Sequence, residues 1–249
     1  MSKWNPAIKA QMLLLEPQSD VNGVKAIGTG IIPVCGSARS GKTTLALALM
    51  EWVTDNTKRD LVFIGMPDSY LEALPPRMKI RSSNPGMKDL SKLRDSVVLL
   101  DDTALQLSSR DGNTSASKSV NRLAGVISHL GLTIIMTTQS MAGVDLSLLR
   151  YTEMSPLVKR VDPMALRVER SEWSNEIQEA QEELRWRNFD RSLYWSIADQ
   201  RLCEHPFSDW MAQDILSRPF RYLAQIDLDL LVHNPAQKDR KKFIKGEES

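Results

Sequence analysis

The segment Gly36–Thr43, "GSARSGKT", places two glycines, a lysine and a hydroxyl residue at a spacing that suits phosphate chemistry. Gly36 and Gly41 permit backbone angles that turn successive N–H groups toward one anion. Lys42 can reach the outer phosphates of a nucleotide, and the hydroxyl of Thr43 can bind Mg²⁺. A Gly- and Ser-rich surface turn is the alternative interpretation. The residues expected to contact nucleotide are Gly36, Ser37, Ala38, Arg39, Ser40, Gly41, Lys42, Thr43 and Thr44.

Two carboxylates follow an apolar stretch in "SVVLLDD", residues Ser96–Asp102. An apolar strand is a rigid arm that can deliver a carboxylate to a metal beside the phosphate-binding loop. We expect Asp101 to hold Mg²⁺ through its water shell, and Asp102 to polarise an attacking water as general base. A pair of Asp residues after a strand can instead cap a helix or close a turn, but the loop upstream favours the metal.

A third polar group follows the apolar part of "GLTIIMTTQS", residues Gly131–Ser140. In a parallel sheet the carboxyl ends of neighbouring strands face a bound nucleotide. A strand that ends at Gln139 would present a neutral amide there, able to donate to the γ-phosphate or to hold the lytic water. We therefore expect Gln139 to sense the γ-phosphate, with ordinary turn chemistry as the alternative.

Short apolar segments alternate with helical ones around these motifs. This alternation predicts a parallel sheet covered by helices on both faces. Pro33 fits its predicted strand poorly, because proline cannot donate to a sheet ladder. The expected strands are Gly30–Cys35, Asp60–Met66, Ser96–Asp102, Gly131–Gln139 and Ser155–Val161, and the expected helices include Thr43–Val53 and Lys118–Leu130.

The character of the chain changes at Glu169, where a charged segment without Pro or Gly predicts a solvent-exposed surface helix. A strand over Ser192–Ala198 and a short closing helix from Asp209 should follow. The whole predicts an α/β fold of the P-loop NTPase (RecA/ASCE-like) class with a C-terminal helical and strand appendage. The expected parts are an N-terminal segment (1–29), the ATPase core (30–168), an extension of the same domain (169–237) and a charged, disordered tail (238–249).

Composition bounds the function further. The 249 residues are 42% hydrophobic and 25% charged, which is enough for a substantial core, and the net charge is +1. Binding to nucleic acid would therefore need local basic patches or an assembly that concentrates them. Cys35 and Cys203 are isolated, no apolar run approaches the roughly 18 residues of a membrane span, and the first residues do not resemble a signal peptide. We expect a cytoplasmic protein without a membrane span.

Together, "GSARSGKTT", "VVLLDD" and "NRLAGVISHLGLTIIMTTQS" resemble the FtsK–HerA superfamily of P-loop DNA-translocating ATPases, over roughly Ile31–Val161. The small size is most similar to the genome-packaging ATPases of tailless icosahedral viruses with an internal membrane. The resemblance implies ATP and Mg²⁺ as cofactors, and the roles given above for Lys42, Thr43, Asp101 and Gln139. The second acidic position is usually Glu in this family. Here it is Asp102, whose side chain is one methylene shorter.

Members of the family act as rings, commonly hexamers, whose channel holds DNA. The resemblance therefore implies a homo-oligomeric ring, hexameric or pentameric, with double-stranded DNA as partner and a capsid vertex protein as a further candidate. The long segment Thr103–Ser119 is rich in Ser, Thr and Gly, and loops of this length tend to be functional or disordered. Arg110 and Lys118 would line the channel with positive charge. A mobile surface loop is the alternative, and the basic tail is a second candidate.

Ring ATPases also need a cation at the γ-phosphate, commonly supplied by the neighbouring subunit. In related translocases an arginine often precedes the sensor glutamine on the adjacent helix, but Ser128 occupies that position here. We expect Arg122, on the same predicted helix, to take this role, with Arg150 and Arg160 as further candidates. A routine surface ion pair is the alternative for each of them.

The leading function is thus ATP hydrolysis coupled to translocation of double-stranded DNA, into a preformed viral capsid, in the host-cell cytoplasm or at a virion vertex. An assembly or secretion ATPase of the filamentous-phage type is a rival, although those proteins usually carry a transmembrane segment. A small-molecule kinase would need an Arg-rich lid, and the sequence has no compact Arg cluster of that kind. A nucleotide-dependent switch or partition protein that does not translocate DNA is the remaining alternative.

Overall fold

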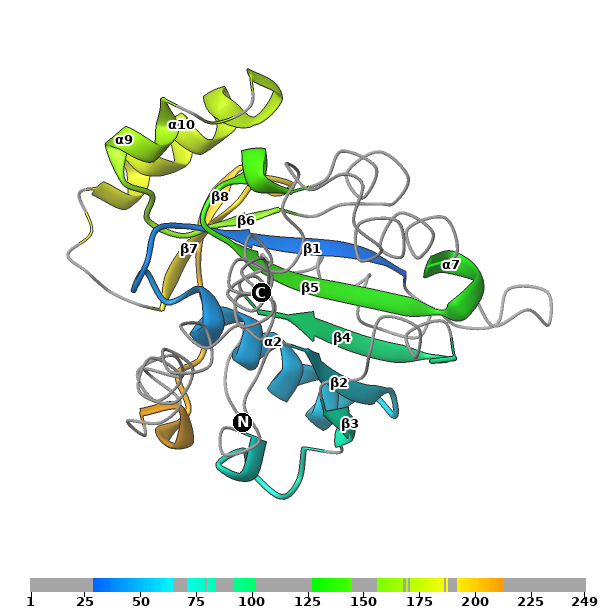
Figure 1. Cartoon of the computed structure of the whole chain (residues 1–249). Helices are drawn as coiled ribbons and strands as arrows, with labels where there is room; N and C mark the ends of the chain where they lie inside the picture. Colours follow the sequence, from blue (N-terminus) through cyan, green and yellow to red (C-terminus); the bar gives the residue numbers. More distant parts are fainter. Residues whose placement is uncertain are drawn as a thin grey trace, which may run out of the picture.

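Eight strands form one sheet within the part of the chain that the structure describes, in the order β3-β2-β4-β5-β1-β6-β7-β8 (Figure 1). Strands β1 to β6 run parallel, and β7 and β8 are antiparallel to their neighbours. The structure is a computed structural model. It describes residues 29–64, 71–78, 80–83, 92–101, 127–144, 156–167, 169, 171–185, 187 and 192–212.

The elements have the following bounds. The strands are β1 (Gly30–Cys35), β2 (Asp60–Ile64), β3 (Ile80–Ser83), β4 (Ser96–Leu100), β5 (Leu132–Thr138), β6 (Leu157–Val158), β7 (Leu193–Ser196) and β8 (Arg201–Glu204). The helices are α2 (Lys42–Asn56), α7 (Ile127–Leu130), α9 (Pro163–Leu166) and α10 (Ser171–Arg185), with 3-10 turns η3 (Met141–Gly143) and η4 (Asp209–Ala212). In this part of the chain no helix is long and apolar enough to cross a membrane.

The predicted α/β fold of the P-loop NTPase class, with its mostly parallel sheet, is confirmed. The strand expected over Ser155–Val161 is shorter, because β6 covers only Leu157–Val158 and the chain then turns toward the loop after β1. Two strands were not predicted, β3 and β8. They lie at the two edges of the sheet and have polar sequences, "IRSS" and "RLCE", since an edge strand needs no continuous apolar run.

Pro33 lies in the middle of β1 without costing the sheet a hydrogen bond. The backbone N–H of Gly36 donates to Thr138 of β5, at 3.1 Å, whereas the carbonyl of Cys35 accepts from Lys159 on the β6 side, at 2.7 Å. Backbone groups alternate in direction along a strand, so Pro33 points to the same side as Cys35. Pairing with β6 begins only at Val34, so among the described residues no strand partner faces the missing N–H of Pro33.

Helices cover both faces of the central strands. Helix α2 packs on one face, against alternate strand residues that include Val34, Leu99 and Ile135. The other face carries the intervening residues, and α7 packs there through Ile127 and Leu130. The central strands therefore have continuous apolar sequences, because each residue is buried on one face of the sheet or the other.

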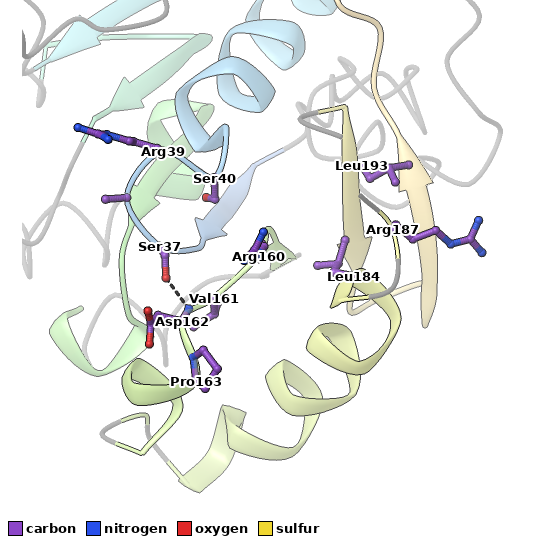
Figure 2. Close-up of a pocket in the computed structure, with 11 residues that line it drawn as sticks. Ser37, Arg39, Ser40, Arg160, Val161, Asp162, Pro163, Leu184, Arg187 and Leu193 are labelled. Atoms are coloured by element: carbon purple, nitrogen blue, oxygen red, sulfur yellow. Dashed lines mark hydrogen bonds between the residues drawn. The ribbon is translucent and has the colours of Figure 1, made fainter. Parts of the chain in front are cut away.

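Helix α10 differs from the expected solvent-exposed helix, because it buries one side. Ile177, Ala180 and Leu184 recur at helical spacing and are buried in an apolar cluster with Val158 and Trp195. Most of its other residues are charged or polar, which explains why the sequence suggests a solvated helix. Leu184, at the end of the buried side, lies near the loop that follows β1 (Figure 2).

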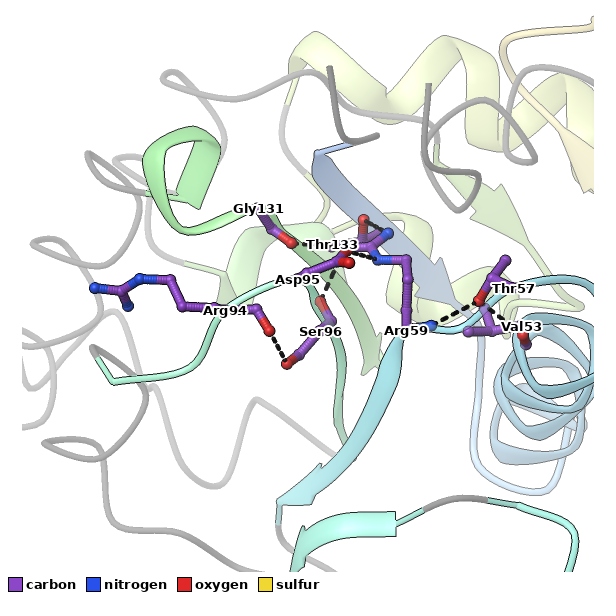
Figure 3. A network of polar contacts seen from close by, with 8 residues as sticks. All are labelled: Val53, Thr57, Arg59, Arg94, Asp95, Ser96, Gly131 and Thr133. Carbon is purple, nitrogen blue, oxygen red and sulfur yellow. Dashed lines mark hydrogen bonds and ion pairs between the residues drawn. The ribbon is translucent and has the colours of Figure 1, made fainter. Parts of the chain in front are cut away.

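A buried arginine joins three segments at the amino ends of the central strands (Figure 3). The guanidinium of Arg59, just before β2, donates to the hydroxyl of Thr133 at 2.8 Å and to the carbonyls of Gly131 at 2.7 Å and Ser96 at 3.0 Å. Its Nε forms an ion pair with Asp95 at 3.1 Å. Arg59 therefore ties the starts of β2, β4 and β5 together, at the end of the sheet opposite to the loop after β1.

The charge on Arg59 persists despite its burial. Burial lowers the pKa of Arg59 to about 10, and the Asp95 carboxylate opposes this shift. When the pKa of a base is lower in the folded protein than in the unfolded protein, the folded protein becomes less stable as the pH falls from the unfolded-state pKa to the folded-state pKa. That interval lies above about pH 10, so the Arg59 guanidinium is charged at neutral pH.

We predict that Arg59→Met lowers the free energy of unfolding by about 3 kcal/mol. The substitution leaves buried acceptors without a donor, and each unsatisfied acceptor costs about 1–3 kcal/mol. Arg94→Met is the matched control. That side chain is exposed, and it donates a hydrogen bond to the carbonyl of the adjacent Leu93. The control should change stability by less than about 0.5 kcal/mol. Urea denaturation measures both, and equal effects would contradict a bridging role for Arg59.

Candidate functional site

The loop between β1 and α2 turns sharply into the helix. Arg39 has φ of 64° and Gly41 has φ of 91°, both in the left-handed region that glycine adopts at no steric cost. The N–H of Ser40 donates to the carbonyl of Ser37 at 3.2 Å, which closes the turn. Gly41 occupies the N-cap position of α2 and supplies no side-chain cap. The first N–H groups of α2 are therefore available to an anion, which the helix dipole also favours.

Lys42 and Thr43 open α2 beside this loop. The ammonium of Lys42 donates to the Ser37 carbonyl at 2.9 Å, so it lies over the loop. The hydroxyl of Thr43 donates to Oδ1 of Asp101 at 3.2 Å. The hydroxyl of Ser40 is buried and has no hydrogen-bond partner among the described residues, which leaves a donor for a bound group.

Asp101 is held in place directly after β4. It is 1% exposed, and its Oδ1 accepts a second hydrogen bond, from the hydroxyl of Thr137 at 2.7 Å. This contact exists because β5 lies between β1 and β4, where Met136 pairs with Leu100. Sequence reasoning assigned no role to Thr137. The polar end of the "TIIMTTQS" segment was the only signal for it.

The donors around Asp101 suit a hard cation that arrives with phosphate. Among the described residues there is no group of three His, Cys, Asp or Glu side chains that could hold a metal by itself. The oxygens at this point include the Asp101 carboxylate and the Thr43 hydroxyl, in direct contact, and the Thr137 hydroxyl on the other side of the carboxylate. Mg²⁺ prefers oxygen ligands and is commonly held by one or two carboxylates with substrate phosphates. These residues therefore fit Mg²⁺ that is bound together with a polyphosphate.

Gln139 follows β5 at the same edge of the sheet, and its side chain is exposed. The β1–β5 register pairs Cys35 with Thr138, so Gln139 lies beside Gly36, where the loop begins. The thiol of Cys35 donates to the Gln139 carbonyl at 3.8 Å. Burial, and secondarily the charge of Glu169, raises the pKa of Cys35 to about 12. The Cys35 thiol is therefore protonated at neutral pH and acts as a donor rather than a nucleophile.

A cavity of about 570 Å³ lies between the loop after β1 and the C-terminal part of the fold (Figure 2). In the figure the guanidinium groups of Arg39 and Arg187 point away from it. Ligand pockets commonly measure about 300–1,000 Å³. The lining residues are Ser37, Ala38, Arg39, Ser40, Arg160, Val161, Asp162, Pro163, Leu184, Arg187 and Leu193.

The wall opposite the loop was not predicted. It combines the segment after β6 with the end of α10 and the start of β7, and no motif marks these residues in the sequence. Arg160, a candidate arginine for a neighbouring subunit, lies against the loop of its own chain, where its carbonyl accepts from the N–H of Ser37 at 2.9 Å. Non-local packing, rather than sequence pattern, brings this wall to the loop.

Hydrogen bonds fix the two walls to each other. The hydroxyl of Ser37 accepts from the N–H of Asp162. Gln181 of α10 holds the same segment, since its side chain accepts from the Val161 N–H at 2.7 Å and donates to the Lys159 carbonyl at 3.2 Å. Gln181 is thus a positioning residue that sequence reasoning also missed.

Several expected site residues cannot be placed. Asp102, Arg110, Lys118, Arg122 and Arg150 lie outside the described residues, as do most of the N-terminal segment and the whole tail. The expected roles of these residues stay predictions.

No protein-family model and no curated protein matches the chain. Similar solved structures include the genome packaging NTPase B204 from Sulfolobus turreted icosahedral virus 2 in complex with ATP-gammaS, at 14% identity and a TM-score of 0.49, over 72% of this chain and 98% of that chain. EssC (ATPases 2 and 3) from Geobacillus thermodenitrificans matches at 14% identity and a TM-score of 0.49, over 79% of this chain and 44% of that chain.

We predict that Gly36→Ala weakens nucleotide binding. A Cβ at Gly36 would lie 2.7 Å from Ser40 Oγ and 2.8 Å from Lys159 Cβ, so the loop or the opposite wall must move. Overpacking costs about 1–3 kcal/mol, which corresponds to a Kd roughly 5- to 140-fold higher if the strain falls on the binding geometry. Calorimetric titration with ATPγS measures the change. Ala198→Ser, which enlarges an exposed residue of the turn between β7 and β8, is the control and should bind nearly as the wild type does. Equal affinities for all three proteins would contradict this role of Gly36.

Proposed function

We propose that this protein is a Mg²⁺-dependent ATPase that couples hydrolysis to translocation of double-stranded DNA. The ATPase proposal is supported above all by the 3.2 Å contact between Thr43 and Asp101. It places a hydroxyl, a buried carboxylate and the uncapped start of α2 at one edge of a parallel sheet. That combination binds a metal–polyphosphate pair better than any other ligand class.

The proposed reaction is attack of water on the γ-phosphorus of ATP, with cleavage of its bond to the β–γ bridging oxygen. The N–H groups at the start of α2 and the Lys42 ammonium bind the phosphates. Thr43 and Asp101 would hold Mg²⁺, which would supply the positive charge that neutralises the phosphates. Asp102 accepts the proton of the attacking water, and the Gln139 amide orients that water or the γ-phosphate.

We assign the nucleoside half of ATP to the cavity beside the loop. The phosphates at α2 would leave the base and ribose on the side of Ser37 and Ala38, which line that cavity. The opposite wall contributes the apolar side chains of Pro163, Leu184 and Leu193. The same wall also includes Arg160, Asp162 and Arg187, and ligand sites commonly combine apolar side chains with such polar groups.

The DNA-translocating part of the proposal is supported by the sequence resemblance to the FtsK–HerA superfamily. A homo-oligomeric ring would bring the Thr103–Ser119 segments together around a channel, with Arg110 and Lys118 toward the phosphate backbone. Arg122 would complete the site of a neighbouring subunit. Packaging of a viral genome is the most specific form of this proposal.

We predict that Lys42→Ala and Asp101→Asn each abolish hydrolysis, because each removes a charge that the phosphates or the metal require. Asp102→Asn should still bind ATP and should hydrolyse it roughly 10²- to 10⁴-fold more slowly, the usual loss when a positioned base is removed. Steady-state phosphate release and ATPγS binding measure these effects. Lys58→Ala, an exposed lysine beyond the other end of α2, is the control for Lys42→Ala and should be fully active. Absence of phosphate release by the wild-type protein would overturn the ATPase proposal. Wild-type turnover in Lys42→Ala would move hydrolysis away from this loop, and wild-type turnover in Asp102→Asn would assign the base elsewhere.

We predict that duplex DNA stimulates hydrolysis, and that Arg110→Ala with Lys118→Ala weakens duplex binding. The dependence of log Kd on log salt should become shallower by about 1 for each DNA phosphate that the variant no longer neutralises. Replacing Lys92 and Arg94 by alanine removes the same charge from an exposed site at the amino end of β4, and should leave the slope unchanged. An unchanged slope in the first variant would move the DNA-binding surface elsewhere, with the tail as the next candidate. No stimulation by duplex would favour a switch or partition protein.

A further inference from the structure

A carboxylate from the C-terminal part of the fold reaches the residues directly after Gln139. Oε2 of Glu169 accepts from the hydroxyl of Ser140 at 3.0 Å and from the N–H of Met141 at 3.0 Å. Glu169 is partly buried and lies between α9 and α10, with its own N–H bonded to the Leu166 carbonyl. It therefore links the tip of β5 to the α9–α10 segment, 28 residues further along the chain.

The backbone on both sides of Gln139 is held by short polar contacts. The hydroxyl of Thr138 donates to the Ser140 carbonyl at 2.8 Å, and the hydroxyl of Ser140 accepts from the Ala142 N–H at 3.1 Å as it caps η3. The Cys35 thiol donates to the Gln139 carbonyl. The side chain of Gln139 is exposed, so its direction follows from where this backbone is held.

Glu169 also stands close to the start of the phosphate-binding loop. Burial is the larger cause of the raised pKa of Cys35, the residue directly before Gly36, and the charge of Glu169 is the second cause. Met141 and Cys35 share an apolar cluster with Ile177 of α10. The tip of β5, the root of the loop and α10 thus meet at Glu169.

We propose that Glu169 is a positioning residue for ATP hydrolysis, which holds Ser140 and Met141 so that the Gln139 amide is aimed at the γ-phosphate. The proposal rests on the function proposed above. A charged acceptor that binds two neighbouring donors restrains a backbone more strongly than neutral contacts do. A displacement of about 1 Å at a reacting group can cost roughly 100-fold in rate. Glu169 acts through Gln139 and does not itself touch the nucleotide.

A purely structural role for Glu169 makes a different prediction. If the carboxylate only capped η3, its removal would lower stability, and any loss of activity would be independent of Gln139. If it positions Gln139, its removal has no further effect once the Gln139 side chain is absent. A double-mutant cycle separates the two cases, because residues that act as a unit are non-additive.

The experiment measures kcat and KM for ATP in four proteins: wild type, Glu169→Ala, Gln139→Ala and the double variant. We expect Glu169→Ala to lower kcat about tenfold, with an ATPγS Kd within about twofold of wild type, since only an interaction needed in the transition state is removed. The double variant should match Gln139→Ala alone. Glu169→Gln keeps an oxygen acceptor and should recover most of the kcat. Glu179→Ala removes an exposed carboxylate of α10 and is the matched control.

Amide hydrogen exchange of the nucleotide-free protein supplies a readout that does not depend on turnover. The Met141 N–H should exchange faster in Glu169→Ala than in wild type, and Glu169→Gln should restore its protection. If Glu169→Ala fails to fold, Ser140→Ala takes its place in the cycle, because it removes one of the two donors.

Two outcomes would overturn the proposal: additive effects on kcat in the cycle, or unchanged kcat and Met141 exchange in Glu169→Ala. Lys42→Ala, measured alongside, separates this proposal from the one it rests on. If Lys42→Ala is inactive but the effects of Glu169→Ala and Gln139→Ala on kcat are additive, only the positioning role of Glu169 is wrong. No turnover in the wild-type protein removes the ATPase function itself, and wild-type turnover in Lys42→Ala removes hydrolysis from this loop.

Discussion

The hydrogen bond from Thr43 to Asp101 joins residues 58 positions apart in the chain, and the proposed chemistry depends on it. A parallel sheet makes the contact possible, because the carboxyl ends of β1, β4 and β5 open on the same edge. Strand β5 between the other two adds the second hydroxyl, from Thr137, to the Asp101 carboxylate. One buried charge thereby fixes the start of α2 relative to two strands. A carboxylate held in this way is rigid before any ligand arrives, which is what a metal–phosphate site requires.

The opposite end of the same strands carries the complementary charge. Arg59 binds the starts of β4 and β5 through the Ser96 carbonyl and the Thr133 hydroxyl. The central strands are thus clamped at their amino ends by a buried guanidinium and at their carboxyl ends by a buried carboxylate. A shift of β5 by one residue would break both sets of contacts and turn every apolar side chain to the other face. The register of β5 therefore determines both the packing of the sheet and the geometry of the site.

The parts of the site that sequence reasoning anticipated are those encoded locally. The loop geometry comes from Gly36 and Gly41, and the alternation of apolar strands with helices predicts the parallel sheet, so the fold class was correct. The contact of Thr137 with Asp101 depends on strand order, which one sequence does not reveal. Gln181 and Glu169 act through hydrogen bonds to backbone groups brought close by packing, and such residues carry no motif. The edge strands β3 and β8 were missed because edges tolerate polar sequences. The roles of Asp102, Arg110, Lys118 and Arg122 stay predictions.

Electron paramagnetic resonance of Mn²⁺, used in place of Mg²⁺ with the slowly hydrolysed analogue ATPγS, tests the metal–phosphate site most directly. We predict that Mn²⁺ binds stoichiometrically only when ATPγS is present, because Thr43 and Asp101 alone do not complete its coordination. The bound Mn²⁺ should show hyperfine coupling to phosphorus. Thr43→Ala should weaken this binding while the fold is retained. Mn²⁺ binding that is equal with and without ATPγS, or that is unchanged in Thr43→Ala, would contradict a metal–phosphate site at Thr43 and Asp101.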